Sequence, residues 1–294
     1  MRVRAPGKLL LSGAYAVLEG APALVLAVDR YAVADCMQFD SAPAPEVAAA
    51  IVPSPRVDVS AMREGDEKLG LGSSAAAVVA ALGTSCALRG EALGDRDVRA
   101  RLAHAAWSAH AQVQSGGSGV DVAASVYGGA LSFSMGQLPA SVSLPVTVRW
   151  TAFFSGAGAR TSSLRATVNA LRLRSADAFG ACINALGDAS HDATLAISAG
   201  DVQGLIAALQ RTRRGLEQLG RASGAPIVSG QVSALADLAE AEGSAFFPSG
   251  AGGGDCCLFV GTTEPSEAFV DHASRASQRR IALSLDTVGV CLAA

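Results

Sequence analysis

The segment Gly70-Leu71-Gly72-Ser73-Ser74-Ala75-Ala76 joins a glycine-rich turn to an apolar stretch that continues to about residue 90. From Ser73 onward the apolar residues recur at the spacing of one helix face, which predicts a helix directly after the glycines. Glycines let a backbone curl closely around an anion, and the first turn of a helix directs free N–H groups and a positive dipole end at it. The segment predicts a phosphate-binding turn, but a glycine turn before an ordinary serine-capped helix has the same pattern.

Only two of the 23 lysine and arginine residues are lysines, and both adjoin glycine-rich segments. Lys8 lies within Ala5-Pro6-Gly7-Lys8-Leu9-Leu10-Leu11-Ser12-Gly13, and Lys68 leads into the segment at Gly70. An ammonium group is a compact point charge that fits among crowded phosphate oxygens, whereas a guanidinium fork needs room and fixed bidentate geometry. Lys8 and Lys68 are therefore candidate phosphate-binding residues, and codon bias is the alternative explanation.

Two further glycine-rich segments carry candidate site residues. Ser249-Gly250-Ala251-Gly252-Gly253-Gly254-Asp255 contains four glycines, each of which costs about 0.5–1 kcal/mol of backbone entropy relative to alanine. This density favours close approach of the backbone to a ligand or to another loop. Ser115-Gly116-Gly117-Ser118-Gly119-Val120-Asp121 places Asp121 where a loop becomes a helix. Its carboxylate would either stabilise the helix start or orient or deprotonate an attacking hydroxyl near phosphates.

Strand and helix patterns are mixed along the whole chain, which predicts an α+β fold with a boundary near residue 150. The predicted strands are residues 8–12, 22–37, 130–134, 146–154, 256–261 and 281–292. The predicted helices are residues 73–90, 95–113, a short helix from 120, 161–173, 176–199, 201–220, 229–241 and 265–278. Residues 40–56 contain four prolines and are expected to form a loop or a ragged sheet edge.

Composition excludes several classes of protein. The net charge is −3 with both signs scattered, so the chain lacks the basic face that nucleic-acid binding requires. No apolar run has the length of a membrane span. The six cysteines form no C-x-x-C pair and the four histidines are dispersed, which favours reduced thiols and no metal cluster. We therefore expect a cytoplasmic protein without a nucleic-acid or membrane partner, and the composition leaves open whether it is a monomer or a homodimer.

Taken together and in this order, the three motifs resemble the GHMP kinase family, which includes galactokinase, homoserine kinase, mevalonate kinase and phosphomevalonate kinase. The resemblance runs from Ala5 to Gly254. Within the family the chain is most similar to phosphomevalonate kinases, whose patterns are K-L-L-L-S-G-E-Y-A-V-L, G-S-G-x-D-V-A-A and P-S-G-A-G-G-G-D-C. The matching segments are Lys8–Leu18, Gly117–Ala124 and Pro248–Cys256.

The resemblance implies a two-lobed fold and a reaction. Residues 1–150 would form an N-terminal lobe similar to domain 2 of ribosomal protein S5, and residues 151–294 a ferredoxin-like lobe. The implied reaction is phosphorylation of (R)-5-phosphomevalonate by ATP with Mg²⁺, which gives the 5-diphosphate. A mevalonate kinase or another small-alcohol kinase of the family is the alternative, and a nucleotide-binding relative without turnover is a more distant one.

The resemblance also implies a role for each motif residue. Lys8 and Asp121 would be the catalytic pair, with Lys8 holding Asp121 ionised. The residues implied to bind ATP are Lys68, Gly70, Leu71, Gly72, Ser73, Ser74 and Ala75, with Ser74 as the Mg²⁺ ligand. The residues implied to bind the acceptor are Lys8, Lys68, Ser118, Gly119, Asp121, Arg160, Thr161, Gly250, Gly252 and Gly253. Arg160 is equally well interpreted as a solvated arginine at a helix start.

Two positions bear on the identity of the acceptor. Ala14 stands where the phosphomevalonate kinase pattern has a glutamate that often lies near the acceptor. His110 stands eleven residues before Asp121, where mevalonate kinases usually carry a metal-binding glutamate, and this favours phosphomevalonate kinase. Apart from the resemblance, a histidine in a predicted helix is expected to be packed or solvated.

Overall fold

The computed structural model describes residues 1–114, 116–158 and 161–293, and contacts between Cα atoms divide the chain into two compact units. Unit 1 comprises Met1–Leu9, Val25–Ser141 and Ser284–Ala294, and unit 2 comprises Leu10–Leu24 and Val142–Leu283. The chain changes unit between Ser141 and Val142, close to the boundary predicted near residue 150. A single boundary would misplace two shorter segments. Residues 10–24 belong to unit 2 although they lie near the N-terminus, and residues 284–294 belong to unit 1 although they lie at the C-terminal end.

Unit 1 contains a sheet in the order β12-β1-β2-β6-β7, with β3 paired to β2. Its strands are β1 (Arg2–Ser12), β2 (Ala23–Phe39), β3 (Pro55–Asp58), β6 (Ala130–Phe133), β7 (Ala140–Val142) and β12 (Cys291–Leu292). A separate two-stranded hairpin pairs β4 (Arg63–Glu64) with β5 (Glu67–Lys68). The last strand of the chain lies beside the first, because Val3 pairs with Leu292 and Arg4 with Cys291.

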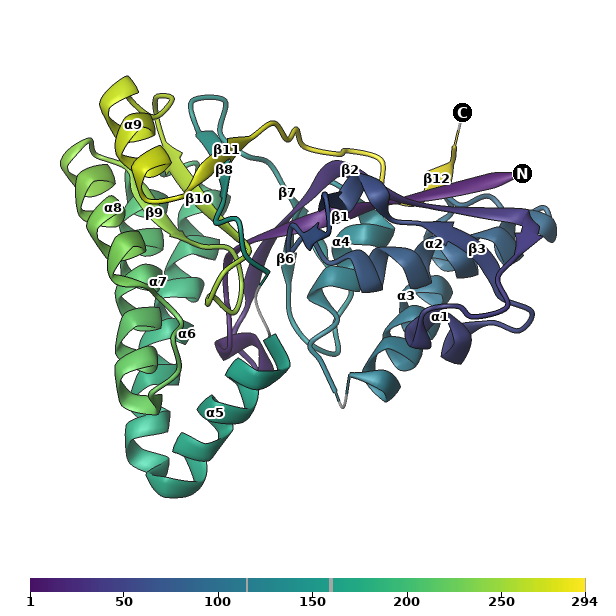
Figure 1. Cartoon of the computed structure of the whole chain (residues 1–294), viewed down its shortest axis with the longest axis horizontal. Helices are drawn as coiled ribbons and strands as arrows, with labels where there is room; N and C mark the ends of the chain where they lie inside the picture. The colour runs from purple at the N-terminus through teal and green to yellow at the C-terminus, as the bar shows by residue number, and fades with distance from the viewer. Residues whose placement is uncertain (115, 159–160, 294) are drawn as a thin grey trace. The chain divides into compact units, whose positions relative to one another are not determined.

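Four helices belong to unit 1, and one of them is central. They are α1 (Pro45–Ala50), α2 (Ser73–Leu88), α3 (Arg96–Val113) and α4 (Val120–Tyr127), with a short 3₁₀ turn η2 (Ser60–Met62). Helix α2 contacts α1, α3 and α4 (Figure 1). Ala75, Val78 and Val79 are fully buried, and Gly83 packs against the side chain of Val3. Burial on several sides fixes the start of α2, where the phosphate-binding turn is predicted.

Unit 2 pairs an antiparallel sheet with long helices. The sheet has the order β11-β8-β10-β9, from β8 (Arg149–Phe154), β9 (Ala245–Pro248), β10 (Cys256–Gly261) and β11 (Arg279–Ile281). The helices are α5 (Thr161–Arg174), α6 (Ala176–Ala199), α7 (Val202–Ser223), α8 (Gly230–Ala241) and α9 (Glu267–Arg275), with a 3₁₀ turn η1 (Ala16–Glu19). Helices α6 and α7 run side by side (Figure 1). Phe153, Phe246, Phe259 and Phe269 form edge-on ring contacts in the core.

The α+β prediction is confirmed, and most predicted helices lie within a few residues of their expected bounds. Of the alternatives for residues 40–56, the ragged sheet edge is confirmed by β3, whose pairing with β2 shifts register between Asp35 and Phe39, but neither alternative includes α1. One expectation about strands is wrong. The strand expected over 281–292 is two short strands, because Asp286 turns the intervening segment back through its own hydrogen bonds. Strands β4, β5, β7 and β9 are not among the predicted elements.

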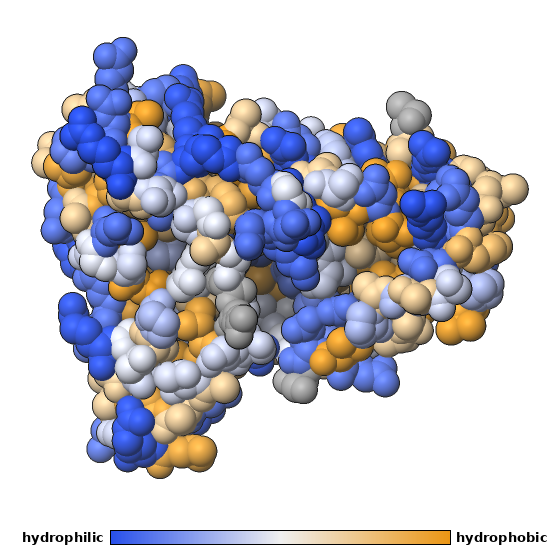
Figure 2. All heavy atoms as spheres, viewed as in Figure 1, coloured by the Kyte–Doolittle hydropathy of each residue, from blue (hydrophilic) through white to orange (hydrophobic). Residues whose placement is uncertain are grey.

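The surface carries no continuous apolar band on the face that Figure 2 shows, where hydrophobic and hydrophilic residues alternate in small patches. Among the described residues, no helix is long and apolar enough to cross a membrane.

Candidate active site

The phosphate-binding segment lies at the start of α2 in unit 1. Gly72 precedes the helix with φ 74°, a left-handed conformation that favours glycine, and no side chain caps the helix. The expectation that Ser73 or Ser74 caps α2 is therefore wrong. The helix begins at Ser73 itself, and the Ser74 hydroxyl is instead bonded to a side chain from α3. Because a first helical turn leaves backbone N–H groups without intrahelical partners, this start is suited to an anion.

Gly72 also lies against both members of the predicted catalytic pair. A Cβ atom at Gly72 would lie 3.1 Å from Cγ of Lys8 and 3.5 Å from Cβ of Asp121. The backbone of β1 is fixed to the same turn, since the Lys8 amide donates to the Leu71 carbonyl at 2.9 Å. The sequence separates Lys8 from Asp121 by more than a hundred residues, and the fold brings both side chains next to Gly72.

Asp121 lies in the first turn of α4, and one oxygen of its carboxylate accepts a backbone hydrogen bond. Its Oδ1 accepts a hydrogen bond from the Val122 amide at 2.9 Å. Its Oδ2 lies 3.9 Å from Nε2 of His110. The same Nε2 atom lies 3.0 Å from the hydroxyl oxygen of Ser74. Among the described residues, Lys8 forms no ion pair with Asp121. The basic side chain that lies within 4 Å of this carboxylate is the imidazole of His110.

The other predicted residues of unit 1 lie nearby in sequence but make different contacts. Lys68 is exposed on β5 and has no ion-pair partner among the described residues. Ser118 accepts a hydrogen bond from the Val120 amide, which turns the chain into α4. Gly119 is packed on Trp107, because a Cβ atom there would lie 2.6 Å from its ring. Trp107 in turn donates from Nε1 to the Gly117 carbonyl at 3.1 Å.

In unit 2 the glycine-rich loop 249–255 connects β9 to β10, and several of the hydrogen bonds that hold it reach residues 10, 15 and 227. Ser249 Oγ accepts from the Leu10 amide and the Ala251 carbonyl accepts from the Tyr15 hydroxyl, both at 2.8 Å. The Gly253 amide donates to the Ile227 carbonyl at 2.9 Å. These bonds tie the loop to two other segments of the same unit.

The glycine at position 252 has a specific steric reason. Its φ is 75°, and a Cβ atom would lie 2.2 Å from the Ile227 carbonyl oxygen. The sequence allows two explanations for the dense glycines, close approach to a ligand or to another loop. At Gly252 the second explanation holds, because its backbone lies against the loop that contains Ile227. Thr161 begins α5 and is exposed. Arg160, also expected at the acceptor site, lies outside the described residues.

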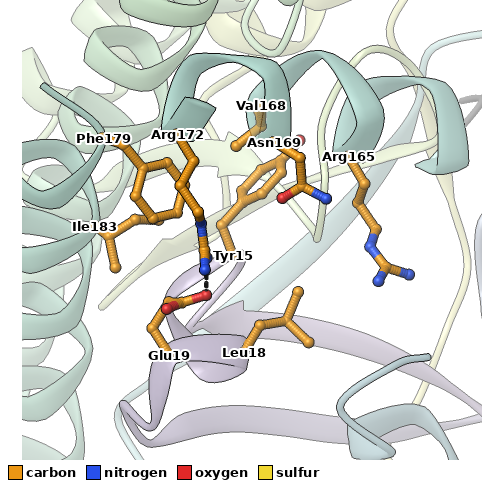
Figure 3. Close-up of a pocket in the computed structure, with 9 residues that line it drawn as sticks. All are labelled: Tyr15, Leu18, Glu19, Arg165, Val168, Asn169, Arg172, Phe179 and Ile183. Carbon is orange, nitrogen blue, oxygen red and sulfur yellow. Dashed lines mark hydrogen bonds and ion pairs between the residues drawn. The ribbon is translucent and has the colours of Figure 1, made fainter. Parts of the chain in front are cut away.

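Unit 2 also contains an open pocket that sequence reasoning missed (Figure 3). Its lining residues are Tyr15, Leu18, Glu19, Arg165, Val168, Asn169, Arg172, Phe179 and Ile183. Arg172 stacks over the Phe179 ring at 4.3 Å and reaches the carboxylate of Glu19. The only sequence signal for this pocket is the i, i+4, i+7 spacing of Arg165, Asn169 and Arg172 on α5, which is also typical of a solvated helix face.

Tyr15 links the pocket to the glycine-rich loop. It adopts a positive φ of 62° just before η1, where the preceding residue is the buried Ala14. Burial raises the pKa of its hydroxyl well above the ordinary value, so the group stays protonated and donates to Ala251. A non-glycine residue at positive φ is uncommon and persists where surrounding contacts hold it.

A divalent cation would find few protein ligands in the described part of the chain. No group of three or more His, Cys, Asp and Glu side chains there is arranged to hold a metal ion. Ser74 and Asp121 supply oxygen atoms near the start of α2, which is the donor type that Mg²⁺ prefers. These oxygens fit a cation that is bound mainly through nucleotide phosphates, as is common for Mg²⁺ in kinases.

The sequence of this chain matches a family model and a curated relative. Residues 45–129 match the model described as "GHMP kinases N terminal domain". The phosphomevalonate kinase of Streptomyces sp. (strain CL190) is 30% identical, with 89% of this chain and 90% of the relative covered.

Solved structures with the same fold include a Lin0012 protein from Listeria innocua, with a TM-score of 0.86 and 22% identity over 99% of both chains. A second is the phosphomevalonate kinase of Streptococcus pneumoniae in complex with phosphomevalonate and AMPPNP. It has a TM-score of 0.79 and 17% identity, over 97% of this chain and 99% of that chain. The identity and coverage of the Streptomyces relative, together with the matched N-terminal model, show that this chain belongs to the GHMP kinase family.

Proposed function

We propose that this protein transfers the terminal phosphoryl group of ATP to (R)-5-phosphomevalonate, forming the 5-diphosphate and ADP. The observation that carries the proposal is the 30% identity to a phosphomevalonate kinase over 89% of the chain. The placement of Lys8 and Asp121 beside Gly72 supports it, because phosphoryl transfer depends on positioning and on neutralisation of charge.

The start of α2 would bind the phosphates of ATP. The backbone from Gly70 to Ala75 passes from a left-handed turn into an uncapped helix, so its N–H groups are available to phosphate oxygens. Lys68 would add a charge at the entrance of this turn. The absence of a side-chain cap at Gly72 distinguishes this helix from α3, whose first N–H groups are occupied by Asp95.

Lys8 and Asp121 would act on the transferred group and on the acceptor. The ammonium of Lys8 would stabilise negative charge that develops in the transition state. A phosphate acceptor is already largely ionised at neutral pH, since its second pKa lies near 6, and it needs no strong base. Asp121 would then orient the reacting groups, with its own position set by the Val122 amide.

Ser74 would hold the Mg²⁺ that accompanies ATP, together with the phosphates of the nucleotide. When bound, the cation neutralises charge on the phosphate oxygens. To bind the cation, the protein would hold the Ser74 hydroxyl oxygen in a fixed orientation, and the hydrogen bond between Ser74 and His110 would provide this.

Residues of unit 2 would bind the acceptor. Within unit 2 we assign this role to Thr161 and Gly250, whereas Gly252 and Gly253 shape the glycine-rich loop through their contacts with residues 226–227. Within unit 2, Ala14 stands where the family pattern has a glutamate. The next residue, Tyr15, donates a hydrogen bond to the glycine-rich loop, so position 14 is one residue from a contact with that loop.

A coupled ADP-release assay with Mg-ATP tests the proposal by comparing 5-phosphomevalonate and mevalonate at equal concentration. We expect a clear preference for the phosphorylated acceptor. Preference for mevalonate would keep the kinase family and overturn the acceptor. Binding of ATP without ADP release from any acceptor in a panel of small alcohols and their phosphates would overturn the enzymatic function.

A further inference from the structure

One imidazole nitrogen faces two oxygens of the candidate active site. His110 lies near the end of α3 and is only 8% exposed. Its Nε2 atom lies 3.0 Å from Oγ of Ser74 and 3.9 Å from Oδ2 of Asp121. The first distance is that of a hydrogen bond, and the second is too long for one. His110 therefore acts directly on Ser74, while Asp121 has its own partner in the Val122 amide.

The direction of this hydrogen bond determines what Ser74 can offer to a ligand. A serine hydroxyl has one proton and two lone pairs. If Nε2 accepts the proton, the lone pairs of Oγ remain free for a cation. If Nε2 donates, the hydroxyl proton remains free for a phosphate oxygen. The two arrangements predict different dependences of nucleotide binding on Mg²⁺.

We propose that His110 is a positioning residue whose Nε2 accepts the Ser74 proton, so that Oγ of Ser74 presents its lone pairs to the Mg²⁺ of the nucleotide. This inference rests on the proposed kinase function. The shortage of clustered metal-binding side chains in the described residues supports it, because a cation with few protein ligands depends on the orientation of each. Partners that orient a ligand typically change metal affinity or activity by about 10–100-fold when they are removed.

The test uses two polar substitutions that differ in reach. In His110→Gln the terminal amide extends about as far as Nε2, whereas in His110→Asn it extends only about as far as Nδ1. Ser74→Ala removes the oxygen itself. His104→Asn is the matched control, because His104 is exposed on the same helix and contacts Trp107 rather than Ser74.

Binding of AMPPNP is measured by calorimetry twice for each protein, once with Mg²⁺ and once with EDTA. We expect His110→Asn and Ser74→Ala to weaken binding about tenfold or more with Mg²⁺ and to change it little with EDTA. His110→Gln and His104→Asn should resemble the wild type in both conditions. The double variant Ser74→Ala/His110→Asn should bind no more weakly than Ser74→Ala alone, because one interaction is removed twice.

Equal weakening with and without Mg²⁺ would overturn the proposal and assign the Ser74 proton to a phosphate oxygen. Wild-type binding by His110→Asn would overturn it as well, and unfolding temperatures identify a variant that has lost its fold. Failure of the ADP-release assay with every acceptor would contradict the proposed kinase function. It would not test the role of His110 in positioning Ser74, which the binding measurements test separately. A wild type whose nucleotide binding does not respond to Mg²⁺ would overturn the role of His110.

Discussion

At the scale of single residues, the lysine at position 8 is the sharpest prediction of the sequence. Its stem lies within van der Waals range of the position that a Gly72 side chain would occupy, opposite Asp121. Crowding of this kind suits a narrow ammonium group and leaves less room for a planar guanidinium.

We expect Lys8→Met and Asp121→Asn each to lower kcat by at least ~10²-fold, as the loss of a positioned electrostatic partner should. Lys8→Arg should fail to restore turnover, because a fork does not replace a point charge. Steady-state kinetics with circular dichroism as the folding control make the measurement. More than half of wild-type kcat in either of the first two variants would contradict the assignment, and near-normal turnover of Lys8→Arg would favour codon bias as the reason for the rare lysines.

Gly72 and Gly90 form a matched pair at the two ends of α2. Both have φ of 74°, so alanine costs a similar amount of backbone energy at each, about 1–2 kcal/mol. At Gly72 the new Cβ atom would approach Lys8 and Asp121. At Gly90 no atom lies within 4 Å of the position that a Cβ atom would take. Gly72→Ala should therefore displace the Lys8 side chain and lower kcat about tenfold or more.

The control variant Gly90→Ala should lose stability without losing kcat. Thermal unfolding and kinetics of the two variants are compared directly. If both variants lose turnover to the same extent, backbone strain in α2 explains the effect and the local crowding does not.

At the scale of elements, local patterns predict helices well and contacts poorly. Helix α3 follows its pattern because Asp95 caps it and Val98, Leu102, Ala106 and Ala109 are buried on one side. Strands β4, β5 and β7 have only two or three residues, too few for a period of two to be recognised in a sequence.

The same limit applies to the candidate site. Glycine motifs predict Gly72 and Asp121, because their chemistry is local and leaves a signature in residue type. The helix pattern of α3 does not show that His110 faces Ser74, since that contact is set by the packing of α2 on α3. Only the resemblance, which aligns His110 with a metal-binding glutamate of mevalonate kinases, points to this position. The pocket beside Glu19 and Arg172 depends likewise on the approach of α5 to η1, and these two residues are 153 positions apart in the chain.

The turn at Tyr15 is the element that we expect to control the glycine-rich loop. Tyr15→Phe removes the hydrogen bond to the Ala251 carbonyl and keeps the ring in the pocket. The net loss of stability should be about 1 kcal/mol, and amide hydrogen exchange at residues 249–255 should become faster. Unchanged exchange in this loop would show that Leu10 and Ile227 suffice to hold it.

At the scale of the whole molecule, residues distant in sequence close each unit. The Tyr31 hydroxyl donates to buried Asp286 at 2.9 Å, and Asp286 also accepts from the amides of Val288 and Gly289. Segment 284–293 is thereby fixed to β2 and to the end of α4, where Gly128 and Gly289 pack backbone to backbone.

This junction should give a signature at high pH. Burial, followed by the hydrogen bond to Asp286, raises the pKa of Tyr31 from 10.0 to about 12. Because the pKa of Tyr31 is higher in the folded state, its protonated hydroxyl contributes fully to the free energy of unfolding below pH 10. This contribution is lost as pH rises through about 12. Between these values the wild type should lose stability faster than Tyr31→Phe in denaturant titrations. Parallel pH profiles of the two proteins would contradict a raised pKa at Tyr31.

The pairing of β12 with β1 has a consequence for how the chain is made. During translation β1 emerges from the ribosome long before β12, so it waits through the synthesis of residues 13–290 for this neighbour. Residues 10–24 wait similarly for the partners that follow residue 141. Nascent domains usually fold in order of emergence, but neither unit of this protein can be completed in that way. During synthesis the edge of β1 that pairs with β12 therefore stays open until residues 291–292 have emerged from the ribosome.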